Sequence, residues 1–170
     1  MVKTENHTRP EMELYSGSPA RVLIIESPYY QSVTDELIAG AVATLDAAGV
    51  SYDRIAVPGA LEIPQAFAQA VAAGLFADNG EGVYAGAIVL GCVIRGETSH
   101  YDIVCNNTNH WLMDTAIRYN VPVGNGVLTV DTEAQAHARA QGGVNGKGGD
   151  AARAVLRLMK LAGDFGSRAS

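Results

Sequence analysis

The sequence predicts a single α/β domain, a three-layer sandwich in which a four-stranded parallel sheet is flanked by helices. The chain has 170 residues, a length typical of one domain. Short apolar runs rich in β-branched residues alternate with longer segments in which apolar residues recur every three or four positions. Strands that alternate with helices in this way form parallel sheets covered on both faces. We expect the domain at residues 20–165, after a flexible arm over 1–19 and before a C-terminal tail over 166–170.

The four expected strands are runs rich in Val, Ile and Leu. Residues 21–26 are apolar on both faces, which is typical of a central parallel strand, and Ser27-Pro28 ends the run. The third run is the most hydrophobic. The expected strands are 21–26, 50–57, 84–94 and 122–130.

Five helices are expected from apolar stripes at helical spacing. Gly49 is suited to end the first helix, and Asp131 or Thr132 to cap the fourth. The Gly-rich residues 141–149 are interpreted as a flexible loop. They are not a nucleotide-binding P-loop, because they follow a helix and lack Gly at 141 and Ser or Thr at 148. The expected helices are about 32–48, 63–77, 99–119, 132–140 and 151–162.

Composition excludes several classes of protein. The formal net charge of −6 argues against binding to nucleic acid or to anionic membranes. No apolar run reaches the roughly 18 residues of a membrane span, and the N-terminus lacks the apolar stretch of a secretory signal. We therefore expect a cytoplasmic protein. Cys92 and Cys105 have no zinc-site spacing, and the histidines show no ligand spacing, so we expect buried thiols and no metal centre.

Ligands of parallel sheets bind beyond the carboxyl ends of the strands. The loops at those ends are 27–31, 57–64, 91–100 and 124–132, and each contains a polar or aromatic group. We therefore expect the functional residues in these four loops.

Three side chains suggest anion binding and proton transfer. His100 is expected in the first turn of a helix, whose positive end favours a neutral imidazole that can act as a general base; alternatively, it is a surface or capping residue. Thr98 and nearby backbone N–H groups can hold a phosphate or simply cap the helix. Arg139 can clamp a phosphate or remain solvated.

Two further side chains suit a flat heterocycle carrying a polyol. Tyr29 is a candidate stacking platform, or else a half-buried aromatic at the end of a strand. Glu62 can accept hydrogen bonds from hydroxyl groups, or simply favour the positive end of the helix that it begins.

Together, four segments of the chain resemble the lumazine synthase family. They are VPGALEIPQAF (57–67), GCVIRGETSHYDIVCN (91–106), VPVGNGVLTVDTEAQAHARA (121–140) and GKGGDAA (146–152). The resemblance implies a flavodoxin-like fold and a transferase that uses no cofactor. The implied reaction is the penultimate step of riboflavin biosynthesis. It condenses 5-amino-6-(D-ribitylamino)uracil with 3,4-dihydroxy-2-butanone 4-phosphate to give 6,7-dimethyl-8-ribityllumazine, phosphate and water.

The resemblance also implies roles for particular residues. His100 would transfer protons, Tyr29 would stack on the pyrimidine, and Lys147 matches a lysine of unassigned role. The aminouracil would further be bound by Ala60, Leu61, Glu62, Cys92, Val93, Ile94 and Asn125. The butanone phosphate would be bound by Glu97, Thr98 and Arg139, the last supplied by a neighbouring subunit.

Two positions depart from the family pattern. The family often has Arg-Phe-Asn where this chain has Pro28-Tyr29-Tyr30, and it usually has an aromatic residue where this chain has Asn125. Loss of that ring would weaken stacking on the aminouracil by about 0.5–1.5 kcal/mol, so we expect altered affinity rather than lost activity.

The resemblance implies a homopentamer with each active site between two neighbours, and possibly a decamer, an icosahedral 60-mer or a contact with riboflavin synthase. Two alternatives to the enzyme stay open, namely a non-catalytic flavin- or lumazine-binding paralogue and a purely structural shell protein. His100, Thr98 and Arg139 argue against the binder, because binding the heterocycle needs no phosphate clamp.

Overall fold

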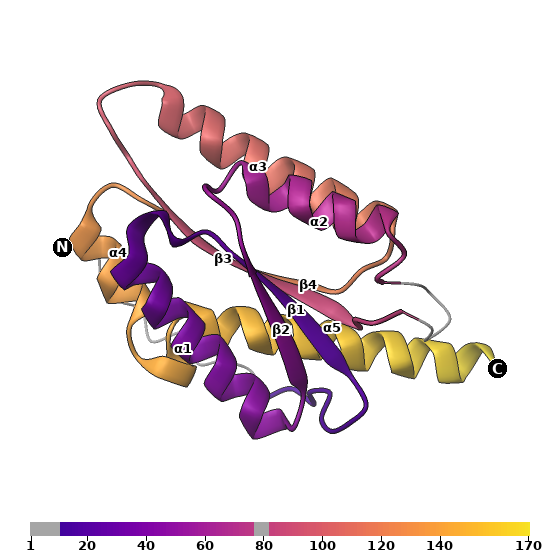
Figure 1. Ribbon diagram of the computed structural model, residues 1–170. Helices are drawn as coiled ribbons and strands as arrows, with labels where there is room; N and C mark the ends of the chain where they lie inside the picture. The colour runs from indigo at the N-terminus through magenta and orange to yellow at the C-terminus, as the bar shows by residue number, and fades with distance from the viewer. Residues whose placement is uncertain (1–10, 77–81) are drawn as a thin grey trace.

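The computed structural model describes residues 11–76 and 82–170, and in them it shows the predicted parallel sheet (Figure 1). The strand order is β2-β1-β3-β4, and all three pairings are parallel. The predicted fold class, a single α/β domain with a four-stranded sheet between helices, is confirmed. The strands are β1 (Arg21–Glu26), β2 (Ser51–Ala56), β3 (Gly86–Ile94) and β4 (Val123–Val130).

Helices cover both faces of the sheet (Figure 1). One face packs against α1 (Gln31–Ala48), α4 (Glu133–Ala140) and α5 (Lys147–Ala169), and the other packs against α2 (Glu62–Ala72) and α3 (His100–Arg118). Short 3-10 turns, η1 (Pro28–Tyr30) and η2 (Gly143–Asn145), follow β1 and α4.

Strand β1 has core on both sides, as its continuous apolar run predicts. Val22 and Ile24 join the core under α1 and α5, whereas Leu23 and Ile25 join the core under α2 and α3. A strand with apolar residues at every position is stable only between two covered faces. This requirement places β1 in the interior of the sheet.

Local capping signals end two helices where the sequence predicts. Gly49 follows α1 with φ of 68°, the left-handed conformation that glycine adopts without steric cost. The hydroxyl of Thr132 accepts a hydrogen bond from the Gln135 N–H at 3.2 Å and so caps α4.

The prediction of a flexible loop over 141–149 was wrong at its end, because α5 already begins at Lys147. Gly148 and Gly149 are buried in the first turn of α5. A Cβ atom on Gly148 would lie 2.7 Å from the carbonyl carbon of Leu37 in α1, too close for any side chain. Gly148 therefore allows α5 to touch α1, and this packing overrides its low helix propensity.

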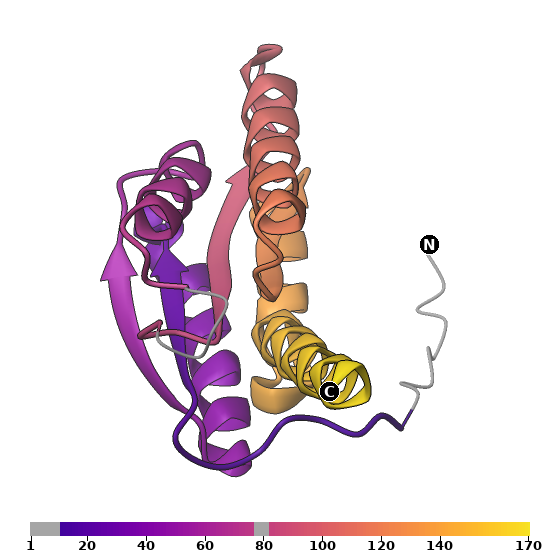
Figure 2. The same cartoon turned by 90° about the vertical axis from the view of Figure 1, so that its right-hand side faces the viewer.

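The described part of the expected N-terminal arm lies against the domain. The Tyr15 N–H donates to the Leu156 carbonyl in α5 at 3.1 Å, and the Gly17 N–H donates to the Ala48 carbonyl at 2.7 Å. Figure 2 shows this segment running past α5 before it enters β1. Residues 1–10 of the expected arm lie outside the described residues, and α5 continues into the expected C-terminal tail as far as Ala169. In the described ranges, no helix combines the length and apolarity needed to cross a membrane.

Candidate active site

A cavity of about 370 Å³ lies at the carboxyl ends of β1 and β3. These neighbouring strands lead to helices on opposite faces, β1 to α1 and β3 to α3, and such a switch point is where parallel sheets bind ligands. Of the four loops predicted to hold the site, 27–31, 57–64 and 91–100 line the cavity. The fourth, 124–132, contributes no lining residue.

The far end of β3 gives the cavity a backbone edge. Pairing of β1 with β3 ends at Glu26 and Leu90, whereas β3 continues four residues further to Ile94, paired with β4. Within the described chain no strand covers the β1 side of residues 91–94, and residues 92–94 line the cavity. Backbone N–H and C=O groups need partners, so this edge can bind the polar edge of a planar ligand.

Cys92 forms part of the apolar wall and is poorly suited to be a nucleophile. Its side chain is buried, and this desolvation raises the pKa of the thiol to about 11. The neutral thiol therefore predominates at physiological pH and serves as a small apolar group.

The loop between β2 and α2 forms a second wall. Ile63 and Phe67, both fully buried, anchor α2 in the core and leave Ala60, Leu61 and Glu62 at the cavity. Glu62 begins α2, where a carboxylate is stabilised by the positive helix end. The cavity therefore has a carboxylate beside an apolar wall, an arrangement that suits a hydroxylated chain attached to a ring.

Two tyrosines from the turn after β1 line the mouth. The Tyr29 ring is 72% exposed and meets the Tyr30 ring edge to face, with 5.1 Å between centroids. Burial is the main cause of a raised pKa at Tyr30, followed by the proximity of Tyr29. Tyr29 is thus available to stack on a ligand while Tyr30 supports it. No role of Tyr30 is expected from the sequence, although its place beside Tyr29 in a loop at a strand end is a signal for one.

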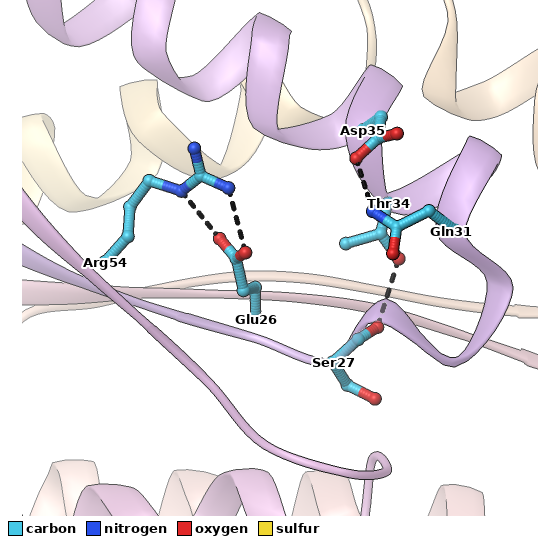
Figure 3. A network of polar contacts seen from close by, with 6 residues as sticks. All are labelled: Glu26, Ser27, Gln31, Thr34, Asp35 and Arg54. Atoms are coloured by element: carbon cyan, nitrogen blue, oxygen red, sulfur yellow. Dashed lines mark hydrogen bonds and ion pairs between the residues drawn. The ribbon is translucent and has the colours of Figure 1, made fainter.

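A polar network holds the start of this turn (Figure 3). The Arg54 guanidinium donates two hydrogen bonds to the Glu26 carboxylate, at 2.8 and 2.9 Å. The Ser27 carbonyl accepts from the Thr34 hydroxyl at 3.0 Å, and the Ser27 N–H donates to the Leu90 carbonyl at 2.9 Å. These bonds join the end of β1 to β2, β3 and α1. The start of the turn that carries Tyr29 is therefore held in place.

His100 is the first residue of α3 and lies exposed at the cavity. Its backbone N–H donates to the Thr98 hydroxyl at 3.4 Å. Thr98 therefore makes a capping contact, one of the two roles predicted for it, and also lines the cavity. Tyr101 and Val104, from the first two turns of α3, also line the cavity.

Three residues expected at the site lie outside this cavity. Glu97 is exposed in the loop before α3 but is not among the lining residues. Asn125 lies exposed on β4, where it donates to the Asn109 side chain at 2.7 Å and accepts from the Val127 N–H at 3.0 Å. Arg139 lies exposed on α4 and donates to the Gln135 carbonyl at 3.1 Å. Any contact of Arg139 with such a cavity would have to be made in a neighbouring copy.

The described residues contain no cluster of three or more His, Cys, Asp or Glu side chains placed to hold a metal ion. What the cavity offers is a neutral apolar wall, a backbone edge, an exposed aromatic ring, a carboxylate and an imidazole. These groups suit binding of a heterocycle together with proton transfer.

Comparison with known proteins agrees with this description. A family model described as 6,7-dimethyl-8-ribityllumazine synthase matches residues 19–163. A protein of that name from Azorhizobium caulinodans is 49% identical over 161 residues, which cover 95% of this chain and 96% of the relative. A protein of the same name from Xanthobacter autotrophicus is 48% identical over 162 residues, which cover 95% of this chain and 96% of the relative. Another from Nitrobacter hamburgensis is 49% identical over 144 residues, which cover 85% of this chain and 86% of the relative.

Proposed function

The chain belongs to the 6,7-dimethyl-8-ribityllumazine synthase family, and we propose that it performs the family's condensation in the cavity at the carboxyl ends of β1 and β3. The reaction joins 5-amino-6-(D-ribitylamino)uracil to 3,4-dihydroxy-2-butanone 4-phosphate. It yields 6,7-dimethyl-8-ribityllumazine, phosphate and two molecules of water. The chain is thus a transferase of riboflavin biosynthesis.

One observation carries the assignment of the site: nine of the twelve residues expected there line a single cavity. They come from three loops that are separate in the sequence, so the fold has to bring them together. The nine are Tyr29, Ala60, Leu61, Glu62, Cys92, Val93, Ile94, Thr98 and His100.

The aminouracil fits the apolar half of the cavity. We place its ring against Tyr29, with its polar edge on the backbone of residues 92–94, which no strand covers on that side in the described chain. The ribityl chain then reaches Glu62, whose carboxylate accepts hydrogen bonds from hydroxyl groups. Stacking and hydrogen bonding together fix the amine that has to attack.

The chemistry requires repeated proton transfer, which we assign to His100. The amine attacks the butanone carbonyl, and loss of water gives an imine. Elimination of phosphate gives an enol, and ring closure releases the second water. A neutral imidazole can accept and return the protons. Holding the two substrates together lowers the barrier by up to about 7–11 kcal/mol in favourable cases, so we expect His100→Ala to slow turnover only modestly.

We assign the phosphate to Thr98 and Glu97 of one subunit and to Arg139 of its neighbour in a homopentamer. Arg139 is exposed and lies outside its own chain's cavity, which is compatible with such an exchange. Helix α3 also exposes apolar side chains, including Ile103, Trp111 and Ile117, that a subunit contact would cover. Light scattering tests the assembly, because five chains of 17.8 kDa form a particle of about 90 kDa.

The decisive assay mixes the two substrates with the protein and follows the absorbance and fluorescence of the lumazine product. We expect product with the wild type, and we expect Arg139→Ala to raise the KM for the butanone phosphate at least about tenfold, as loss of a charge-assisted clamp requires. Arg118→Ala is the matched control, because it removes an exposed arginine paired with Asp114 at the far end of α3.

Two results would contradict the proposal. If the wild type binds the heterocycle and forms no product, the chain is a binding paralogue rather than an enzyme. If Arg139→Ala leaves the KM for the phosphate substrate unchanged, the assignment of the clamp is wrong even though the enzyme is active.

A further inference from the structure

The first turn of α3, which carries His100, is weakly held by its own loop. Residues 95–99 are all exposed. The N-cap residue Ser99 makes no capping hydrogen bond with its side chain, and the bond from the His100 N–H to the Thr98 hydroxyl is long at 3.4 Å. Because free N–H groups and exposed loops fray easily, the orientation of His100 depends on contacts from elsewhere.

Those contacts converge on Arg95, the residue that follows β3. Its Nε donates to Asp131 Oδ1 at 2.8 Å, and its Nη1 lies 3.7 Å from Asp102 Oδ1. The guanidinium carbon lies 4.2 Å from the centroid of the Tyr101 ring. The backbone N–H of Arg95 donates to the Val130 carbonyl at 2.9 Å. One planar group thus contacts both the first turn of α3 and the loop after β4.

Resting on the function proposed above, we infer that Arg95 is a positioning residue that holds His100 at the cavity by clamping the first turn of α3 to the loop after β4. Tyr101 directly follows His100 and itself lines the cavity. Holding the Tyr101 ring and the Asp102 carboxylate therefore fixes the backbone from which the imidazole projects.

Asp131, the partner of Arg95 in the loop after β4, is itself held in place. The Asp131 N–H donates to the Gln135 side chain at 2.8 Å, and the Thr132 hydroxyl accepts from the Gln135 N–H at 3.2 Å. Asp131 is therefore bound to the start of α4, which packs on the face of the sheet opposite α3. The clamp thus joins α3 to a part of the chain that is separately held.

The geometry requires arginine rather than any positive charge. A guanidinium can stack on the Tyr101 ring through its face while its edge donates to the Asp131 carboxylate and forms an ion pair with Asp102. A lysine ammonium at the same position keeps the charge but cannot make both contacts. Arg95→Lys therefore separates positioning from simple electrostatics.

Loss of the clamp should affect turnover more than stability. Arg95 is about half exposed, and ion pairs of this kind contribute little to the free energy of unfolding. Displacing a catalytic group by even about 1 Å costs up to about a hundredfold in rate. We expect Arg95→Gln to lower kcat about threefold and by no more than His100→Ala does, to leave the KM of both substrates within about twofold, and to leave the melting temperature nearly unchanged.

A double-mutant cycle tests whether Arg95 acts through His100. Arg95→Gln and Arg95→Lys are each made in the wild type and in His100→Ala, and kcat, both KM values and thermal melting are measured. Arg21→Gln is the matched control, because Arg21 is a strand arginine paired with Asp53 at 2.7 Å at the opposite end of the sheet. We expect both Arg95 variants to lose turnover in the wild type and to have little further effect in His100→Ala, while Arg21→Gln retains the wild-type kcat.

Several results would overturn the inference. An equal fold-loss in both backgrounds means that Arg95 does not act through His100, and full activity of Arg95→Lys means that charge alone suffices. A large fall in melting temperature, or an equal loss of kcat in Arg21→Gln, would indicate a general structural role. In each case the wild type still makes the lumazine, so the proposed function stands. Absence of product from the wild type, or a His100→Ala variant with unchanged turnover, would instead refute the assignment on which the inference rests.

Discussion

Gly148→Ala tests the packing that decides where α5 begins. Gly148 lies in the first turn of α5, and an added Cβ would lie 2.7 Å from the carbonyl carbon and 2.9 Å from the Cα of Leu37. Both atoms belong to the backbone of α1, whose Leu37 side chain is fully buried. Neither helix can yield locally, so the clash has to be relieved by moving α5 away from α1.

The expected cost follows from two opposing effects. Overpacking of a close contact destabilises by about 1–3 kcal/mol, and this site lies at the upper end because the atoms that the Cβ meets are backbone rather than a flexible side chain. Alanine recovers up to about 1 kcal/mol through its higher helix propensity. We therefore expect a net loss of about 2 kcal/mol in the free energy of unfolding, which lowers the melting temperature by about 4–8 °C in a chain of this size.

Gly163→Ala is the matched control. Gly163 also lies in α5, but apart from its own turn of helix no atom lies within 4 Å of the position that its Cβ would take. At this position only the higher helix propensity of alanine matters, so we expect the free energy of unfolding to rise by about 0.5–1 kcal/mol. Both variants are unfolded in urea at the same chain concentration and followed by circular dichroism, because subunit association also affects stability. If both changes stabilise the protein, the close-packing argument is wrong.

Two further predictions concern the strands beneath the cavity. Arg54→Met should lower the free energy of unfolding by about 2–3 kcal/mol, because it leaves the nearly buried Glu26 carboxylate without its partner. Glu26→Gln should lower it by only about 1 kcal/mol, because the Arg54 guanidinium can return to water. The opposite order in urea unfolding would refute this. Burial raises the pKa of the Cys92 thiol from 9.0 to about 11. Alkylation of Cys92 in the native protein should therefore be slow at pH 8 and accelerate about tenfold per pH unit, as mass spectrometry can follow. The unfolded thiol ionises first, so this group's contribution to stability is complete below about pH 9 and is lost as the pH rises toward about 11. Rapid alkylation at pH 8 would contradict the burial.

Short-range signals in the sequence determined the elements and the position of the site. Apolar periodicity is set by contacts within a strand or a helical turn, so the order of strands and helices could be predicted. The caps at Gly49 and Thr132 depend on residues at most four positions away. The rule that parallel sheets bind ligands at the carboxyl ends of strands then placed Tyr29, Glu62 and His100 in lining loops.

Only the tertiary structure decided which distant segments meet. Gly148 lies in a helix that packs closely against α1, although the glycines around it in the sequence have low helix propensity. Arg95 meets Asp131 across 36 positions because β3 and β4 are paired. The loop after β4 also follows the carboxyl end of a strand, yet it contributes no residue to the cavity. Such contacts depend on strand order and on the faces to which the helices pack, and no local pattern of residues encodes either.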